Sequence, residues 1–156
     1  MVIPIHDENP VRRTPVVTYA LIIVNLAVFL FVEPIDHLSF GSNQTTLRAY
    51  CKQVAFFDEY AAIPKELVTN DPVRHRDVVQ TTQGPATCSQ VTRDYFPNKQ
   101  PALSALFAMF LHGGWLHILG NLLFLYIFGN NVEDRLGRLK FLLFYLIAGY
   151  LSLIHI

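Results

Sequence analysis

The chain has 156 residues, of which 52% are hydrophobic and 15% charged, and its formal net charge is zero. This composition is too apolar for an ordinary soluble domain, and the charge balance excludes the basic field expected of a nucleic-acid-binding protein. The apolar residues form long blocks separated by polar segments, which is typical of a multi-pass membrane protein whose partners are the lipid bilayer and other proteins. The sequence has no glycine-rich phosphate-binding motif, so no nucleotide cofactor is predicted.

The first apolar block covers residues 16–32. As a helix of about 17 residues it extends about 25 Å, at the short end of what crosses ~30 Å of hydrocarbon. We predict a first transmembrane helix over 16–32, preceded by a segment, 1–15, that lacks the basic start and cleavage site of a secretory signal. Asn25 is a strongly polar group in the middle of this block, and we expect it to make a hydrogen bond to a neighbouring helix.

The stretch from residue 33 to residue 101 contains charges of both signs, several prolines and both cysteines. We predict a long extracytoplasmic loop here, irregular over 71–101, with either a short amphipathic piece or a solvated turn of helix over 56–67. Cys51 and Cys88 form an even pair in this loop. Two interpretations stay open: a disulfide if the loop lies in an oxidising compartment, or two free thiols.

The second apolar block, 102–129, is long enough to span a membrane with tilt and carries three polar side chains, each costing roughly 2 to 3 kcal/mol in hydrocarbon unless it faces protein or water. His117 and Asn121 are four residues apart, so a helix places both on one face, where they offer two hydrogen-bond donors to a common point. This is the geometry of an oxyanion hole. His112 lies five residues before His117. A regular helix turns it away from that face, and we expect the two following glycines to relax the first turn and let it point elsewhere.

Other interpretations of these residues remain. Taken alone, His112 fits a packing histidine that is hydrogen-bonded to a neighbouring helix. A zinc site is a second alternative, but no third ligand stands nearby at a metal-binding spacing and both cysteines are far away in the loop. A transporter or channel that uses the histidine pair for protons is disfavoured because no acidic residue lies within the apolar blocks. We predict neither a metal nor an organic cofactor.

A short polar loop, 130–138, separates this block from a third apolar segment, 139–156. Basic residues lie before the first apolar block and in or just after the loop; they are Arg12, Arg13, Arg135, Arg138 and Lys140. By the positive-inside rule they place the N-terminal segment, 1–15, and the loop, 130–138, on the cytoplasmic side. From residue 139 to residue 150 the apolar run covers only about 18 Å, too short to cross. The last six residues match one reading frame of a common sequencing-library transposon end, so we treat them as a candidate artefact.

The spacing His-x4-His-x3-Asn, set in apolar sequence, resembles the second transmembrane helix of the rhomboid family of intramembrane serine proteases. The resemblance implies that His117 and Asn121 help to bind the oxyanion of the tetrahedral intermediate. It also implies that His112 caps the same helix near the active-site cavity, in a supporting role.

Two further stretches carry the same resemblance. Residues 3–25, rich in prolines and ending at Asn25, resemble the start of a bacterial branch of the family. Glu133, Arg135 and Gly137 resemble the Glu-x-Arg-x-Gly turn that follows the second helix, where the charged pair ties helix ends together. A solvated surface pair is the alternative, and we expect no catalytic role for it.

The sequence departs from the family pattern where the chemistry depends on it. The family nucleophile is a serine in a Gly-x-Ser-Gly setting on a later helix, and its base is a histidine on a helix later still; neither is present here. Pro101-Ala102 also stand where the family has a Trp-Arg pair. The resemblance is strong over 4–32 and 107–146 and weak between them, and this fragment alone is expected to be inactive.

Together these features predict an all-α, polytopic membrane helical bundle of rhomboid type, truncated within the third transmembrane helix. The resemblance implies a serine-type endopeptidase that cleaves peptide bonds in or near the transmembrane helices of membrane protein substrates. It also implies an integral protein of the bacterial inner (plasma) membrane with a cytoplasmic N-terminus. The alternative is a proteolytically inactive rhomboid-like scaffold that binds transmembrane helices.

Overall fold

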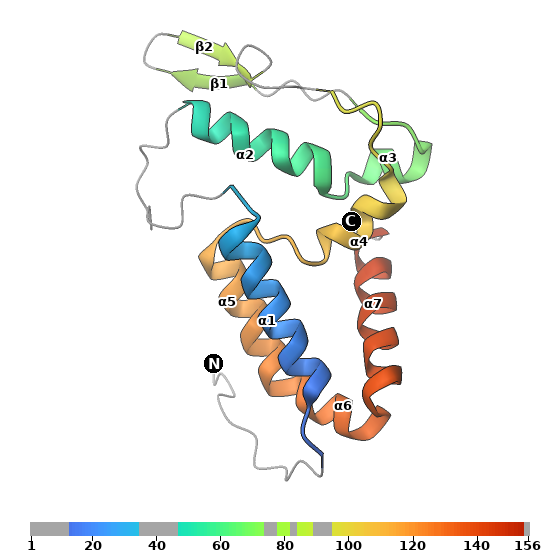
Figure 1. Cartoon of the computed structure of the whole chain (residues 1–156). Coiled ribbons are helices and arrows are strands. Elements are labelled where there is room, and N and C mark those ends of the chain that lie inside the picture. The colour runs from blue at the N-terminus through green and yellow to red at the C-terminus, as the bar shows by residue number, and fades with distance from the viewer. Residues whose placement is uncertain (1–12, 35–46, 74–77, 82–83, 89–94, 155–156) are drawn as a thin grey trace, which may run out of the picture.

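The computed structural model describes residues 13–34, 47–73, 78–81, 84–88 and 95–154 (Figure 1). Over these residues the chain is mainly helical, as the sequence predicts. Helix α1 (Val16–Phe31) contacts both α5 (Trp115–Phe124) and α7 (Arg138–Ile154). A π-helical segment, η2 (Leu125–Gly129), and helix α6 (Asn130–Leu136) lead from α5 to the start of α7.

In the described part of the chain, none of the helices combines the length and the apolar character needed to cross a membrane. The mainly helical structure confirms the predicted fold class. The membrane-spanning bundle stays a prediction.

The second apolar block differs from the single helix predicted over 102–129. It contains α4 (Pro101–Ala108), then residues 109–114 without regular helix, and only then α5, which continues into η2. Two consecutive glycines weaken helix propensity at this point, and Gly114 becomes the N-cap residue of α5. The apolar composition of the block did not reveal the break.

The short segment predicted as a loop, 130–138, is also helical in the structure. Helix α6 fills most of it, and the turn into α7 is reduced to Gly137. Gly137 has a φ of +79°, a left-handed conformation that glycine adopts without steric cost. The predicted loop is therefore one tight corner between two helices.

Glu133, on α6, caps the N-terminus of α1. Its buried carboxylate accepts hydrogen bonds from the backbone N–H groups of Val17 at 3.0 Å and Thr18 at 2.8 Å, and from the Thr18 hydroxyl at 2.8 Å. The first N–H groups of a helix have no partner within the helix, and negative charge is favourable there. Glu133 therefore ties two helix ends together, as the resemblance implied, whereas Arg135 is exposed.

The predicted extracytoplasmic loop has more regular structure than expected. It contains α2 (Leu47–Tyr60), α3 (Pro64–Thr69) and an antiparallel hairpin of β1 (Val78–Thr81) and β2 (Gly84–Thr87), in which Val78 pairs with Thr87. In Figure 1, α2 crosses beyond the C-terminal end of α1. The hairpin replaces part of the irregular chain predicted over 71–101. We call residues 47–88, from α2 to the cysteine directly after β2, the loop module.

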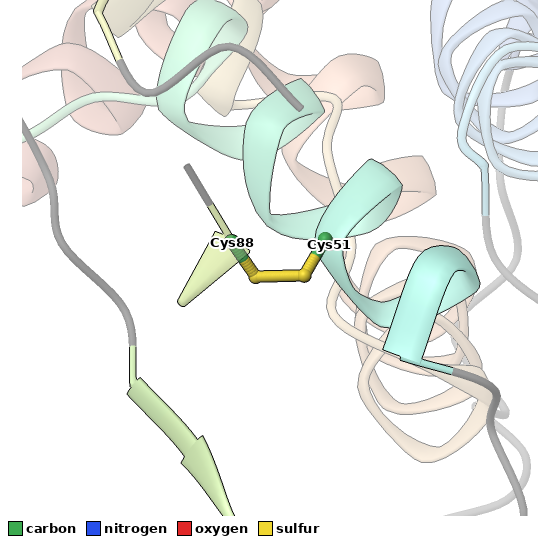
Figure 2. Close-up of a disulfide and its surroundings, with 2 residues drawn as sticks. All are labelled: Cys51 and Cys88. Atoms are coloured by element: carbon green, nitrogen blue, oxygen red, sulfur yellow. A yellow bond between two sulfur atoms is a disulfide. The ribbon is translucent and has the colours of Figure 1, made fainter. Parts of the chain in front are cut away.

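A disulfide joins Cys51, in α2, to Cys88, directly after β2 (Figure 2). The structure thus decides the alternative that the sequence left open. Both cysteines are buried, and the bond attaches the hairpin to α2 across 37 residues of chain.

A buried lysine makes the second tie within this region. The Lys99 ammonium lies 2.6 Å from a Glu66 carboxylate oxygen and donates to the Asp58 carbonyl oxygen at 2.6 Å. Glu66 also accepts the Val73 N–H at 2.8 Å. Lys99 therefore links α2 and α3 to the chain that enters α4.

Replacing Glu133 should destabilise the fold. We expect Glu133→Ala to lower the free energy of unfolding by about 2 to 3 kcal/mol, because hydrogen bonds to a charged group contribute about 1.5 to 3 kcal/mol and helix caps about 1 kcal/mol. Thermal unfolding followed by circular dichroism measures the change. Asp134→Ala is the matched control, since Asp134 accepts only an exposed N–H, from Arg13, in the described structure. Equal effects of the two variants would contradict the capping role.

Candidate functional site

A cavity of about 620 Å³ lies beside α5 and α7, and its wall contains all three polar residues singled out in the second apolar block. His117 and Asn121 reach it from α5, and His112 reaches it from the segment before α5. Most of the remaining lining is apolar and comes from α5, η2 and α7. The structure therefore gathers the predicted site residues around one space with low-polarity walls.

Helix α5 holds His117 and Asn121 in this wall. At its N-terminus the Trp115 ring packs edge-on against the Phe29 ring of α1, with ring centroids 5.0 Å apart. Ile118 is fully buried, whereas His117 and Asn121 are both exposed and both border the cavity. Packing against α1 thus anchors the helix while leaving the two hydrogen-bonding side chains accessible.

His112 does not point away from this pair, and that expectation from regular helix geometry is wrong. His112 precedes α5 and is not part of it, so the 100° rotation per residue does not apply to it. Its buried ring lies against the His117 ring, with centroids 5.3 Å apart. Its Nδ1 lies 3.1 Å from the Phe110 carbonyl oxygen. Because a carbonyl only accepts, Nδ1 carries a proton, and the ring orientation is set by this bond.

Sequence reasoning missed Glu33, which it assigned to the start of the loop. Glu33 is only 4% exposed, and its Oε1 accepts the His112 N–H at 2.8 Å. Its Oε2 is buried without a hydrogen-bond partner in the described structure. Burial raises the pKa of Glu33 to about 7, against a smaller lowering by the His112 hydrogen bond. The available signal was an acidic residue directly after an apolar run.

Asn25 lines the same cavity from α1. Its Nδ2 donates to the Leu21 carbonyl oxygen of the same helix at 2.7 Å. The Tyr145 side chain of α7 borders the same cavity. The hydrogen bond expected between Asn25 and a neighbouring helix stays a prediction.

The arrangement suits hydrogen bonding to a developing negative charge. An imidazole N–H and a carboxamide N–H from one helix face can donate to one oxygen, and apolar walls strengthen such bonds. Across the described ranges, no three metal-binding side chains come together.

These features define a helical protein with a histidine and asparagine donor pair in an apolar cavity. Residues 100–155, about a third of the chain, match the model of the Rhomboid domain family. The match supports assigning the chain to the rhomboid family, which consists generally of intramembrane serine proteases and related membrane proteins. No curated protein and no solved structure matched the chain. The matched region contains His112, His117 and Asn121, whereas α1 and the loop module lie outside it.

The raised pKa of Glu33 makes stability depend on pH. A carboxyl whose pKa is higher in the folded state than its ordinary value of 4.5 stabilises the fold below about pH 4.5, and this contribution is lost as pH rises through about 7. We expect Glu33→Gln, which cannot ionise, to remove this part of the dependence. The measurement is the difference between the unfolding free energies of the two proteins from pH 4 to pH 8; a difference that does not change with pH would contradict the assignment.

Proposed function

We propose that this chain supplies the oxyanion-binding part of a rhomboid-type intramembrane serine endopeptidase that acts on transmembrane protein substrates. The observation that carries the proposal is the position of His117 and Asn121 on one helix face, at an apolar cavity, within the region that matches the Rhomboid domain. The sequence has no Gly-x-Ser-Gly, so the proposal requires a nucleophile and a base supplied outside these 156 residues.

In the proposed reaction a serine attacks the scissile carbonyl, a histidine base takes the serine proton, and an acyl-enzyme forms. The carbonyl oxygen becomes an oxyanion in the tetrahedral intermediate. His117 and Asn121 donate hydrogen bonds to that oxygen, and more strongly to the oxyanion than to the neutral carbonyl, which is how such donors accelerate the step. His112 supports the site by packing its ring against His117.

A membrane location is proposed for the helical core because α1, α5 and α7 expose large apolar side chains. Phe31 is 84% exposed, Leu116 86% and Leu139 71%. Apolar surface on this scale marks contact with lipid or protein. The disulfide of the loop module supports an oxidising, extracytoplasmic location for that part. The positive-inside rule supports a cytoplasmic N-terminus, and the family resemblance supports a bacterial inner membrane.

A rhomboid-like scaffold without proteolytic activity is the second candidate. It requires neither the nucleophile nor the base that the protease needs. Such a scaffold would use the same cavity to bind a transmembrane helix. Reading the coding sequence beyond residue 156 discriminates the two, because a Gly-x-Ser-Gly followed by a later helical histidine is required only for the protease.

The oxyanion roles predict a specific kinetic pattern. In the full-length protein, His117→Ala and Asn121→Ala should each lower kcat by about 10² to 10³ with little change in KM, because the lost hydrogen bond acts mainly in the transition state. Cleavage of a transmembrane substrate in proteoliposomes gives both constants.

Two controls define this experiment. Leu119→Ala changes the same helix at an exposed position outside the cavity lining and should leave kcat near wild type. His112→Ala should act mainly through stability or cavity shape, because His112 is buried. If His112→Ala alone destroys turnover in a folded protein while the other two variants stay near wild type, the roles are assigned wrongly.

The topology can be checked with single cysteines in a Cys51→Ser, Cys88→Ser background. Lys52→Cys in α2 and Lys140→Cys in α7 replace exposed residues on the two predicted sides. A membrane-impermeant thiol reagent should label Lys52→Cys in spheroplasts, and should label Lys140→Cys only after lysis. The opposite pattern would reverse the orientation.

A further inference from the structure

Glu33 connects the end of α1 to the segment that carries His112. We propose that Glu33 is a positioning residue of the candidate site: its carboxyl holds residues 109–114 so that the His112 ring lies against His117, and the hold changes when the carboxyl gains or loses a proton. The meaning of this proposal for catalysis rests on the proposed function, but the contacts themselves do not.

Glu33 is itself held in place. Its backbone N–H donates to the Val28 carbonyl oxygen at 3.1 Å, so Glu33 continues the last turn of α1. Its side chain is almost completely buried. The carboxyl is therefore attached to a helix that packs against α5, η2, α6 and α7.

The His112 N–H depends on an acceptor outside its own segment. The N–H groups of Phe110 and Leu111 still bond to carbonyl oxygens of α4, at Phe107 and Ala108. At His112 the regular helical hydrogen bonds have ended, so its buried N–H needs another partner. The His112 N–H finds its partner in Glu33, 79 residues away in the sequence. Without that acceptor, a buried donor is left unpaired, which favours displacement of the segment.

The bond between Glu33 and the His112 N–H affects the site through the His112 ring. The His112 ring is fixed on its own segment by Phe110, and it contacts the rings of His117 and Phe29. A shift of the segment therefore moves the ring relative to His117. His117 is one of the two proposed oxyanion donors.

One oxygen of the Glu33 carboxyl is free to carry a proton. The buried Glu33 Oε2 has no hydrogen-bond partner in the described structure, so it is the oxygen available to carry a proton while Oε1 still accepts. The ionised carboxylate is the stronger acceptor but leaves a charge buried. The titratable side chains that the described contacts place at this end of α1 are His112, before α5, and His117, on α5.

The test uses the 156-residue chain in detergent micelles and NMR of the His112 amide. Glu33→Ala should accelerate hydrogen exchange of this amide on the order of tenfold, because a bond to a charged acceptor is lost, and should shift the His117 ring signals. Glu33→Gln keeps an acceptor oxygen and should retain slow exchange. It should also remove a step in the His112 amide chemical shift that the wild type shows near neutral pH.

Glu133→Gln is the matched control, because it weakens a buried carboxylate contact at the other end of α1. It should reduce thermal stability without changing His112 exchange well below the melting temperature. Unchanged exchange in Glu33→Ala, or a retained pH step in Glu33→Gln, would overturn the proposal. If Glu33→Ala does not fold, the comparison of Glu33→Gln with wild type decides alone.

These readouts need no catalysis, so they separate the two proposals. Loss of the contacts with normal proteolysis in the full-length protein would refute a positioning role and leave the proposed function intact. Intact contacts in a protein that cleaves no substrate would do the reverse. In an active full-length protein, Glu33→Gln should change the pH profile of kcat while leaving KM near wild type.

Discussion

The placement of α1 depends first on the Glu133 carboxylate at its N-terminus. This one side chain accepts three hydrogen bonds from α1, and the donors belong to Val17 and Thr18, far from Glu133 in the sequence. Close approach at this end also requires Gly129, because a Cβ there would lie 3.0 Å from the Thr18 side chain. Separate contacts fix the other end of the helix, where Phe29 packs against Trp115 and Glu33 accepts the His112 N–H.

The site contains buried polar side chains whose burial lowers the stability of the fold. His112 and Glu33 are both buried, and their backbone and side-chain bonds satisfy most but not all of their polar atoms. An unpaired buried carboxyl oxygen is rare in folded proteins and is often found where function requires it. Fold stability alone does not explain its retention, because an apolar residue at position 33 would avoid the cost of burying a carboxyl.

The loop module achieves order by a different physical means. A segment of this size has too little apolar surface for a core of its own, so cross-links replace part of it. The Cys51–Cys88 bond restrains the hairpin, and the buried Lys99–Glu66 pair attaches α3 to the chain before α4. The lysine pair therefore ties the module to the chain that enters α4, the helix that precedes residues 109–114.

The sequence by itself determined what depends on neighbours along the chain. The apolar block 16–32 predicted α1 almost to the residue, and the four-residue spacing placed His117 and Asn121 on one helix face, because helix periodicity is a local property. Their catalytic roles stay predictions. Only the tertiary structure decided the choice of a disulfide and the contacts of His112 with His117 and Glu33. These features depend on which distant segments meet in the fold. The residues next to a backbone N–H or a thiol are the same whether or not a distant partner binds it, so local sequence does not reveal the contact.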